Sequence, residues 1–233
     1  MKFPWKTSRN RQNLSLMGRL WKHAIILRTV LAICLSLPAL GVASATNTVK
    51  VPGTANIFSA GLKSPVAPAG GGAGTLPIQI PIAPCVARVE FQASGGLILG
   101  PSFGNSGPDG YSDPYAPMDI SSIGGISGYL GPGFALVGVF LTDAAPAAPA
   151  PPRLDFTGNQ QHPTFLSLSP ELGQVFFIGD GQAYGGLGTQ SFIIPAGATR
   201  LFLGMPDCYD ASSAPGWYGD NSGSLSVKVS QLP

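Results

Sequence analysis

The sequence predicts an all-β protein, an antiparallel β-sandwich of jelly-roll type with about eight or nine short strands. Several short segments alternate apolar and polar residues, or are continuously apolar over the length of a strand. The chain has 32 Gly and 23 Pro, which suit many tight turns, yet 44% of its residues are hydrophobic and only 10% are charged. That balance is not the composition of a disordered chain. No segment has a convincing helical pattern.

The first 45 residues have the features of a secretory signal peptide. Seven basic side chains lead into a short apolar stretch over residues 29–40, and Ala43-Ser44-Ala45 fits a cleavage site. We expect cleavage before Thr46 and a mature protein that is secreted, periplasmic or extracellular. An uncleaved anchor helix is the alternative, which Arg28 beside the apolar stretch disfavours.

The mature chain is expected to be acidic. Residues 1–45 hold seven of the 13 Lys and Arg residues and none of the 11 Asp and Glu residues, so six basic side chains face 11 acidic ones, a net charge of −5. This argues against nucleic acid as a partner. No second long apolar segment suggests a membrane span after cleavage. Residues 46–233 suit a single domain.

The strands follow one another with turn residues between them. Prolines confine residues 76–82 to a sheet edge. Residues 86–93 alternate, with Val89 and Phe91 on the side that faces the core. The nearly continuous apolar run at 134–141 predicts a central strand. In chain order, we expect strands over residues 46–51, 57–62, 76–82, 86–93, 134–141, 173–178, 190–194, 200–204 and 224–229.

Three connecting segments stand out. Residues 94–117 are long and irregular, which is typical of a functional or mobile loop. Residues 144–152 form a Pro/Ala-rich run that we interpret as a loop inserted in the single domain, because neither flank has enough strands for a sandwich. Gly179-Asp180-Gly181 has the chemistry of a hairpin turn.

Two cysteines remain after cleavage, Cys85 and Cys208. An exported pair favours a disulfide. However, Cys85 begins a strand about 25 Å long, which would place the two sulfurs at opposite rims of the sandwich. Both interpretations stay open at this stage.

The final segment carries the candidate site. We expect the strands at 200–204 and 224–229 to be antiparallel neighbours, so that the loop between them returns to the rim that it left. That loop contains Asp207, Asp210, Asp220 and Asn221. Carboxylate, amide and carbonyl oxygens are the ligands of Ca²⁺, which takes six to eight of them. The alternative is that residues 219–223 are only a turn, which Asx residues and glycines build without metal.

Residues 190–229 resemble the C-terminal part of the PA-IL type (LecA-like) calcium-dependent galactose-binding lectins, with fainter similarity over 90–117 and 135–141. The resemblance implies a galactose-binding-like sandwich and galactose-type sugars as ligands. The residues that carry it are Asp207, Pro215-Gly216, Trp217, Asp220-Asn221 and Ser222-Gly223-Ser224.

The resemblance also implies the residues of the site. Ca²⁺ would be held by Asp207, Asp220, Asn221 and the carbonyls of Trp217 and Gly95, and the sugar would be contacted by Asp113, Asp207, Asn221 and Trp217. The chain departs from the family at three of these positions. Gly95 replaces an aromatic residue, Asp220 replaces an amide, and Asp113 aligns only loosely with a histidine. Trp217, Tyr218, Tyr111 and Tyr115 are candidates for an aromatic platform or for ordinary rim packing.

We do not expect an enzyme. His162 is the single histidine of the mature chain, and no nucleophile or metalloprotease spacing is present. Carboxylates for glycoside hydrolysis are the alternative, with Asp109, Asp113, Asp119 and Asp155 in predicted loops.

The expected function is calcium-dependent carbohydrate binding, with a glycan or glycoconjugate as partner. The alternative is an exported structural or adhesive protein in which calcium is only structural. Homo-oligomerisation stays open.

Overall fold

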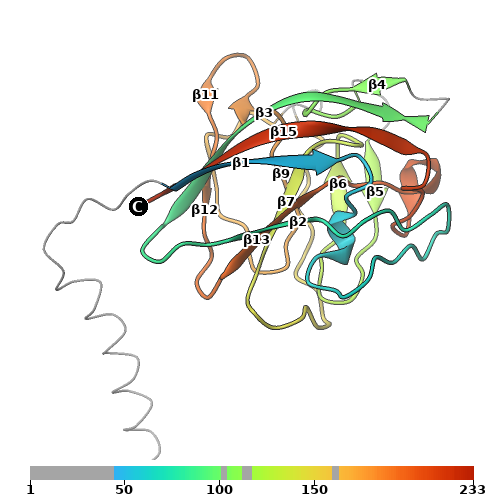
Figure 1. Cartoon of the computed structure of the whole chain (residues 1–233), viewed down its shortest axis with the longest axis horizontal. Helices are drawn as coiled ribbons and strands as arrows, with labels where there is room; N and C mark the ends of the chain where they lie inside the picture. The colour runs from blue at the N-terminus through green and yellow to red at the C-terminus, as the bar shows by residue number, and fades with distance from the viewer. Residues whose placement is uncertain (1–44, 101–103, 112–116, 159–162) are drawn as a thin grey trace, which may run out of the picture. The chain divides into compact units, whose positions relative to one another are not determined.

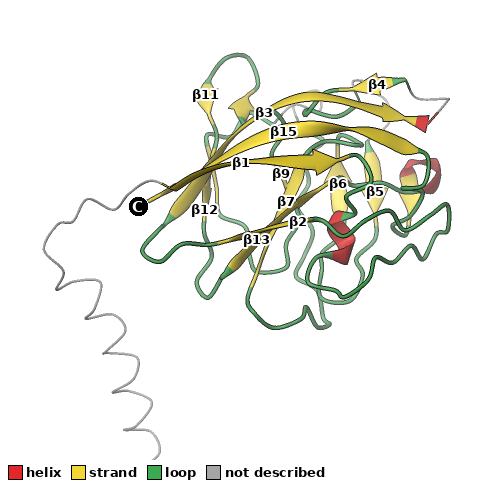
Figure 2. Ribbon diagram, viewed as in Figure 1, coloured by secondary structure: helices red, strands yellow, loops and turns green. Residues whose placement is uncertain are grey.

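The computed structural model describes residues 45–100, 104–111, 117–158 and 163–233 (Figure 1). These residues belong to one compact unit, Ala43–Pro233, in which strands dominate and helix is confined to short turns (Figure 2). The predicted leader lies outside the described residues except for Ala45, so its cleavage stays a prediction. No helix in the described ranges has the length and hydrophobicity needed to cross a bilayer.

Two larger sheets and two smaller ones make up the fold. The largest has the order β1 (Ala45–Pro52), β15 (Asn221–Leu232), β3 (Arg88–Leu99), β12 (Ser191–Ile193) and β8 (Ser167–Leu168), and β4 (Asn105–Ser106) also pairs with β3. The second has the order β2 (Ile78–Pro81), β13 (Arg200–Gly204), β7 (Val137–Leu141) and β9 (Phe176–Phe177). The smaller sheets are β14 (Ser212–Ser213), β5 (Met118–Ile120) and β6 (Tyr129–Gly131), and the hairpin of β10 (Gln182–Ala183) and β11 (Gly188–Thr189).

The two larger sheets share one apolar core, which confirms the predicted β-sandwich. Phe176 of β9 and Phe192 of β12 belong to different sheets, and their ring centroids lie 5.1 Å apart. On β15, Leu225, Val227 and Val229 are buried because alternate residues of a strand point to the same face. Each such side chain stabilises the fold by about 1.5–3 kcal/mol relative to an exposed one.

The strands β3 and β15 form the longest ladder of the fold. All 12 residues of β15 pair with β3, from Asn221 opposite Leu99 to Leu232 opposite Arg88. The strand β1 pairs along the other edge of β15, so the three strands run side by side in Figure 1. The ladder therefore joins β1, on one side of the sheet, to β12, on the other.

The prediction that strands 200–204 and 224–229 are neighbours was wrong. The strand β13 pairs with β2 and β7, whereas β15 pairs with β1 and β3, in the other sheet. Both edges of each strand are occupied, so neither has a free edge for the other. Alternation shows that a strand has one buried face, but not to which of the two sheets it belongs.

Several single elements also test the sequence pattern. The strand β2 lies at a sheet edge and β7 lies between β13 and β9, as predicted. The segment 57–62 is not a strand. It contains the buried 3-10 helix η1 (Ile57–Ser59), because the Asn56 side chain accepts a hydrogen bond from the Phe58 amide at 3.0 Å and caps a tight turn. A second 3-10 turn, η2 (Tyr209–Ala211), follows β13.

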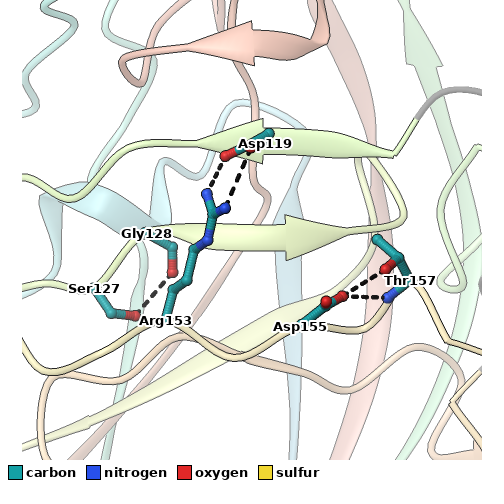
Figure 3. A network of polar contacts seen from close by, with 6 residues as sticks. All are labelled: Asp119, Ser127, Gly128, Arg153, Asp155 and Thr157. Carbon is teal, nitrogen blue, oxygen red and sulfur yellow. Dashed lines mark hydrogen bonds and ion pairs between the residues drawn. The ribbon is translucent and has the colours of Figure 1, made fainter.

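The chain after the Pro/Ala-rich segment is attached to the small sheet β14-β5-β6 (Figure 3). The guanidinium of Arg153 forms an ion pair with Asp119 of β5, and Asp155 pairs with Leu130 of β6 through a β-bridge. Asp155 also accepts hydrogen bonds from the amide and hydroxyl of Thr157, at 2.8 and 2.6 Å. The segment thus returns to the same compact unit.

Cys85 and Cys208 do not form a disulfide. Cys85 is exposed, and Cys208 is buried at the start of the loop that follows β13.

Candidate functional site

The loop between β13 and β15 is folded back on itself. The amide of Gly216 donates to the carbonyl of Asp207 at 3.1 Å, and Cys208 and Pro215 form a β-bridge. The loop therefore begins and ends at one place, although it leaves one sheet and enters the other. This geometry brings residues at both of its ends together.

Asp207 and Asn221 meet at this place. The amide nitrogen Nδ2 of Asn221 donates to Oδ2 of Asp207 at 2.7 Å, and both side chains are buried. The same nitrogen lies 3.3 Å from the carbonyl oxygen of Gly53, in the turn after β1. The backbone amide of Asp207 donates to the hydroxyl of Tyr218 at 3.2 Å, and that hydroxyl donates to the carbonyl of Met205 at 2.9 Å.

Among the described residues, no positively charged side chain lowers the pKa of the Asp207 carboxyl. Burial raises its pKa to about 8; the hydrogen bond from Asn221 opposes this shift, the negative charge of Asp220 adds to it, and the amide of Cys208 opposes it. Only 2% of Asp207 is exposed. A buried carboxyl under these conditions keeps its proton near neutral pH unless a cation replaces it.

Asp220 completes the acidic character of the site from the solvent side. Its side chain is exposed and lies against Gly100, where an added Cβ would stand 2.5 Å from Oδ2 of Asp220. A larger residue at position 100 would displace this carboxylate. The site therefore has one buried and one exposed carboxylate, one amide and the Gly53 carbonyl.

These groups fit a hard cation. Asn221 presents Nδ2 to two oxygens, and a half-turn of its amide would present Oδ1 instead. Oxygens of Asp207, Asn221 and Gly53 would then face one another, with the carboxylate of Asp220 nearby, and water or a ligand hydroxyl would supply the rest of the six to eight that Ca²⁺ takes. Among the described residues, no group of three or more His, Cys, Asp or Glu side chains gathers as a metal site. This candidate site contains two carboxylates.

Gly95 lies away from this cluster, which corrects its predicted position. The sequence predicted a strand ending near Ala93 and a loop at Gly95, but β3 continues to Leu99. Gly95 pairs with Leu225, four ladder positions from the pair of Leu99 and Asn221, or roughly 13 Å along the strand. The Ser94-Gly95-Gly96 sequence resembles a turn, but here it continues the ladder.

Trp217 lies beside the site and forms a ring pair with Tyr209. Their ring centroids are 5.0 Å apart, tilted by 31°, and the two residues are 37% and 51% exposed. Trp217 has a φ of 68°, and Asp210 and Ala211 next to Tyr209 have φ of 48° and 59°. Such left-handed backbone is costly for residues other than glycine and is concentrated at functional sites. Tyr218, by contrast, is fully buried and cannot serve as a platform.

A glycine-rich segment holds this part of the loop. The amides of Trp217, Tyr218 and Gly219 donate to the carbonyls of Gly70, Gly72 and Gly71, at 2.9, 3.1 and 3.0 Å. An added Cβ on Gly71 would collide with the indole of Trp217. The Pro/Ala/Gly-rich loop before β2 therefore positions the aromatic pair.

The structure places only some of the other predicted residues. Asp113, Tyr115 and His162 fall outside the described residues. Asp119 is paired with Arg153, and hydrogen bonds from Thr157 lower the pKa of Asp155, the opposite of the shift that a general acid needs.

The sequence interpretation missed two contributors and left the role of a third open. The Gly53 carbonyl has no side-chain signal. Tyr209 stands in a segment that looks like an insertion. The structural role of Tyr218 could have been suspected, because a buried tyrosine requires a partner for its hydroxyl.

No family model and no curated protein matches the chain. Among solved structures, a chain described as "EclA N-terminal domain; PllA-like lectin" is similar, with 16% sequence identity and a TM-score of 0.35 over 79% of this chain and 94% of that chain. A likeness of this size carries no argument about function, so the proposals below rest on the residues of this chain.

Proposed function

We propose that this protein is an exported carbohydrate-binding protein whose ligand site is organised by Ca²⁺. The observation that carries the proposal is the meeting of Asp207, Asn221 and the Gly53 carbonyl beside the exposed carboxylate of Asp220. Ca²⁺ would replace the proton that burial otherwise keeps on the carboxyl of Asp207. The leader over residues 1–45 supports export to the periplasm or the extracellular space.

The aromatic pair supports a sugar as the ligand. An ion with open positions binds vicinal hydroxyls through charge-assisted contacts, and an exposed indole offers an apolar face to the C–H groups of a sugar ring. Trp217 and Tyr209 provide such a surface next to the carboxylates. The residues proposed for the ion are Asp207, Asp220, Asn221 and Gly53, and those proposed for the sugar are Trp217 and Tyr209.

One observation favours a second candidate function, an exported structural or adhesive protein with purely structural calcium. Asp207 is 2% exposed, so its carboxylate can hold an ion more readily than it can touch a sugar. The ion would then tie the turn at Gly53 to the start of β15. In this case, chelation lowers the melting temperature but no glycan raises it.

The test combines calorimetry and a glycan array. The mature protein is titrated with Ca²⁺ and then applied to a broad glycan array in millimolar calcium and in EDTA. Calcium binding with calcium-dependent glycan binding supports the proposal. Calcium binding without any glycan signal supports the structural alternative, and the absence of calcium binding rejects both.

Two variants separate the ion from the sugar. Asp207→Asn should abolish calcium binding, whereas Asp210→Asn, in the same loop with an exposed side chain, should leave it unchanged. Trp217→Ala should leave calcium binding intact and weaken glycan binding by about tenfold, while Trp217→Phe should retain most of it.

A further inference from the structure

A second concave site lies away from the candidate calcium site. It has a volume of about 320 Å³ and is lined by Asp109, Asp180, Gln182, Tyr184, Phe177 and Pro163, among others. It borders the turn before β10, which contacts β3 at Ala93, six residues before Leu99. The two sites are therefore separated by roughly 20 Å along the strand. The volume suits a small ligand, since such pockets begin at about 300 Å³.

The walls of this site are fixed by backbone contacts. Oδ1 of Asp109 accepts the amide of Asp180 at 2.9 Å, and the carbonyl of Asp180 accepts the amide of Ala93 at 3.0 Å. Gly181 has a φ of 87° and lies so close to the Phe91 carbonyl that an added Cβ would collide with it. These contacts hold the turn closely against β3, so the part of the lining at Asp109 and Asp180 is fixed by the fold.

The chemistry of the lining is acidic and aromatic. Asp109 and Asp180 bring two carboxyl groups, and no Lys, Arg or His is among the described residues that line the site. Oδ1 of Asp180 accepts the amide of Gln182 at 2.7 Å. The backbone amide of Tyr184 donates to the carbonyl of Pro163 at 3.1 Å. The residue is 50% exposed. Phe177 forms an apolar, buried part of the lining.

We propose that this site binds a small organic cation, with its ammonium group between Asp109 and Asp180 and its apolar or ring portion against Tyr184. A positive charge is attracted by two carboxylates and by the face of an aromatic ring, and a charge-assisted hydrogen bond is about twice as strong as a neutral one. An amino sugar and a simple cyclic amine share this chemistry. The proposal does not depend on the calcium site.

The test is calorimetry with D-glucosamine at mildly acidic pH, where its amine is charged. All titrations contain EDTA, which removes calcium, and use the Trp217→Ala background, which removes the indole proposed to contact the sugar at the other site. The neutral analogues are D-glucose and N-acetyl-D-glucosamine, and cyclohexylammonium keeps the ring and charge without hydroxyls. Binding of either ammonium compound, with at least about tenfold weaker binding of the neutral sugars, supports the proposal.

The variants assign the binding to this site. Asp180→Asn keeps the oxygen that caps Gln182 but removes the charge, and should weaken ammonium binding by about tenfold or more. Glu171→Gln removes one exposed charge elsewhere and should leave binding unchanged. If Asp180→Asn lowers the melting temperature, Tyr184→Ala provides a second test, because its side chain is exposed and its removal should also weaken ammonium binding. Three results would overturn the proposal. They are equal binding of glucose and glucosamine, no binding of either ammonium compound, and unchanged ammonium binding in both Asp180→Asn and Tyr184→Ala.

Discussion

The amide of Asn221 donates to the carboxyl of Asp207 at 2.7 Å across 14 residues of sequence. Asn221 begins β15 of one sheet, and Asp207 lies in the loop just after β13 of another. This contact joins the two ends of the loop between β13 and β15, together with the backbone contact of Gly216 with Asp207. Because the contact is buried, any change in the charge of Asp207 should be felt in both stability and ligand binding.

The charge of Asp207 should make the stability of the calcium-free protein fall as pH rises. Its pKa is raised to about 8 in the folded state, against about 3.9 in an unfolded chain. Between these values the folded state binds more protons at Asp207 than the unfolded state, so the contribution of this group to stability is fully present below about pH 4 and is lost as the pH rises to about 8. Urea unfolding across this range in EDTA measures the effect.

The matched variant for this prediction is Asp207→Asn. It should flatten the pH dependence between about pH 4 and pH 8, whereas Asp210→Asn should leave it as in the parent protein. An unchanged slope in Asp207→Asn would show that another group titrates.

Calcium binding should release a proton from Asp207. At pH values below about 8 the carboxyl must lose its proton to hold the ion, so calcium affinity rises with pH. Calorimetry in two buffers with different ionisation enthalpies counts the protons released. A release that persists in Asp207→Asn would place the proton on a different group.

Removal of the Tyr218 hydroxyl should destabilise the loop. The hydroxyl accepts from the amide of Asp207 and donates to the carbonyl of Met205, both in a buried setting. We expect Tyr218→Phe to cost about 1–3 kcal/mol in the free energy of unfolding, because both partners are left unsatisfied. Chemical unfolding of Tyr218→Phe and Tyr209→Phe compares this with an exposed hydroxyl, where no measurable loss is expected.

Substitution of Gly71 should disturb the aromatic pair. Gly70 and Gly71 have φ of 80° and 68°, so alanine at either position carries a similar backbone cost, of about 1–2 kcal/mol. Only at position 71 does the added Cβ collide with the Trp217 ring, because nothing lies within 4 Å of a Cβ at position 70. Gly71→Ala should therefore shift Trp217 fluorescence and weaken glycan binding, and Gly70→Ala should do neither. Identical spectra for the two variants would contradict the positioning role of Gly71.

Alternation and apolar runs were sufficient to predict the fold class. The edge position of β2 and the central position of β7 follow from prolines in one case and a continuous apolar run in the other. The pairing of β13 with β15 was mispredicted, yet the ends of both strands still meet. In a sandwich the two sheets share their rims, so a loop that crosses between sheets also returns to one rim.

The components of the site could be predicted only where the type of side chain indicates metal binding. Asp207, Asp220 and Asn221 stand out by residue type, although their role in metal binding stays a prediction. The Gly53 carbonyl could not be found in this way, because a backbone oxygen has no signature and the turn lies 168 residues from Asn221. Gly95 was predicted in a loop but lies within β3, because consecutive small residues do not indicate whether a strand ends or continues.

The pairing of β1 with β15 also decides how the molecule can be held. Ala45 lies opposite Gln231, so the start of the described unit and the C-terminus emerge together, while Asn221 stands roughly 33 Å away at the other end of the same strand. Attachment to a surface, a fusion partner or a bead through either end would leave the rim with the candidate calcium site pointing outward and accessible. Several copies fixed in this way would present their rims as an array.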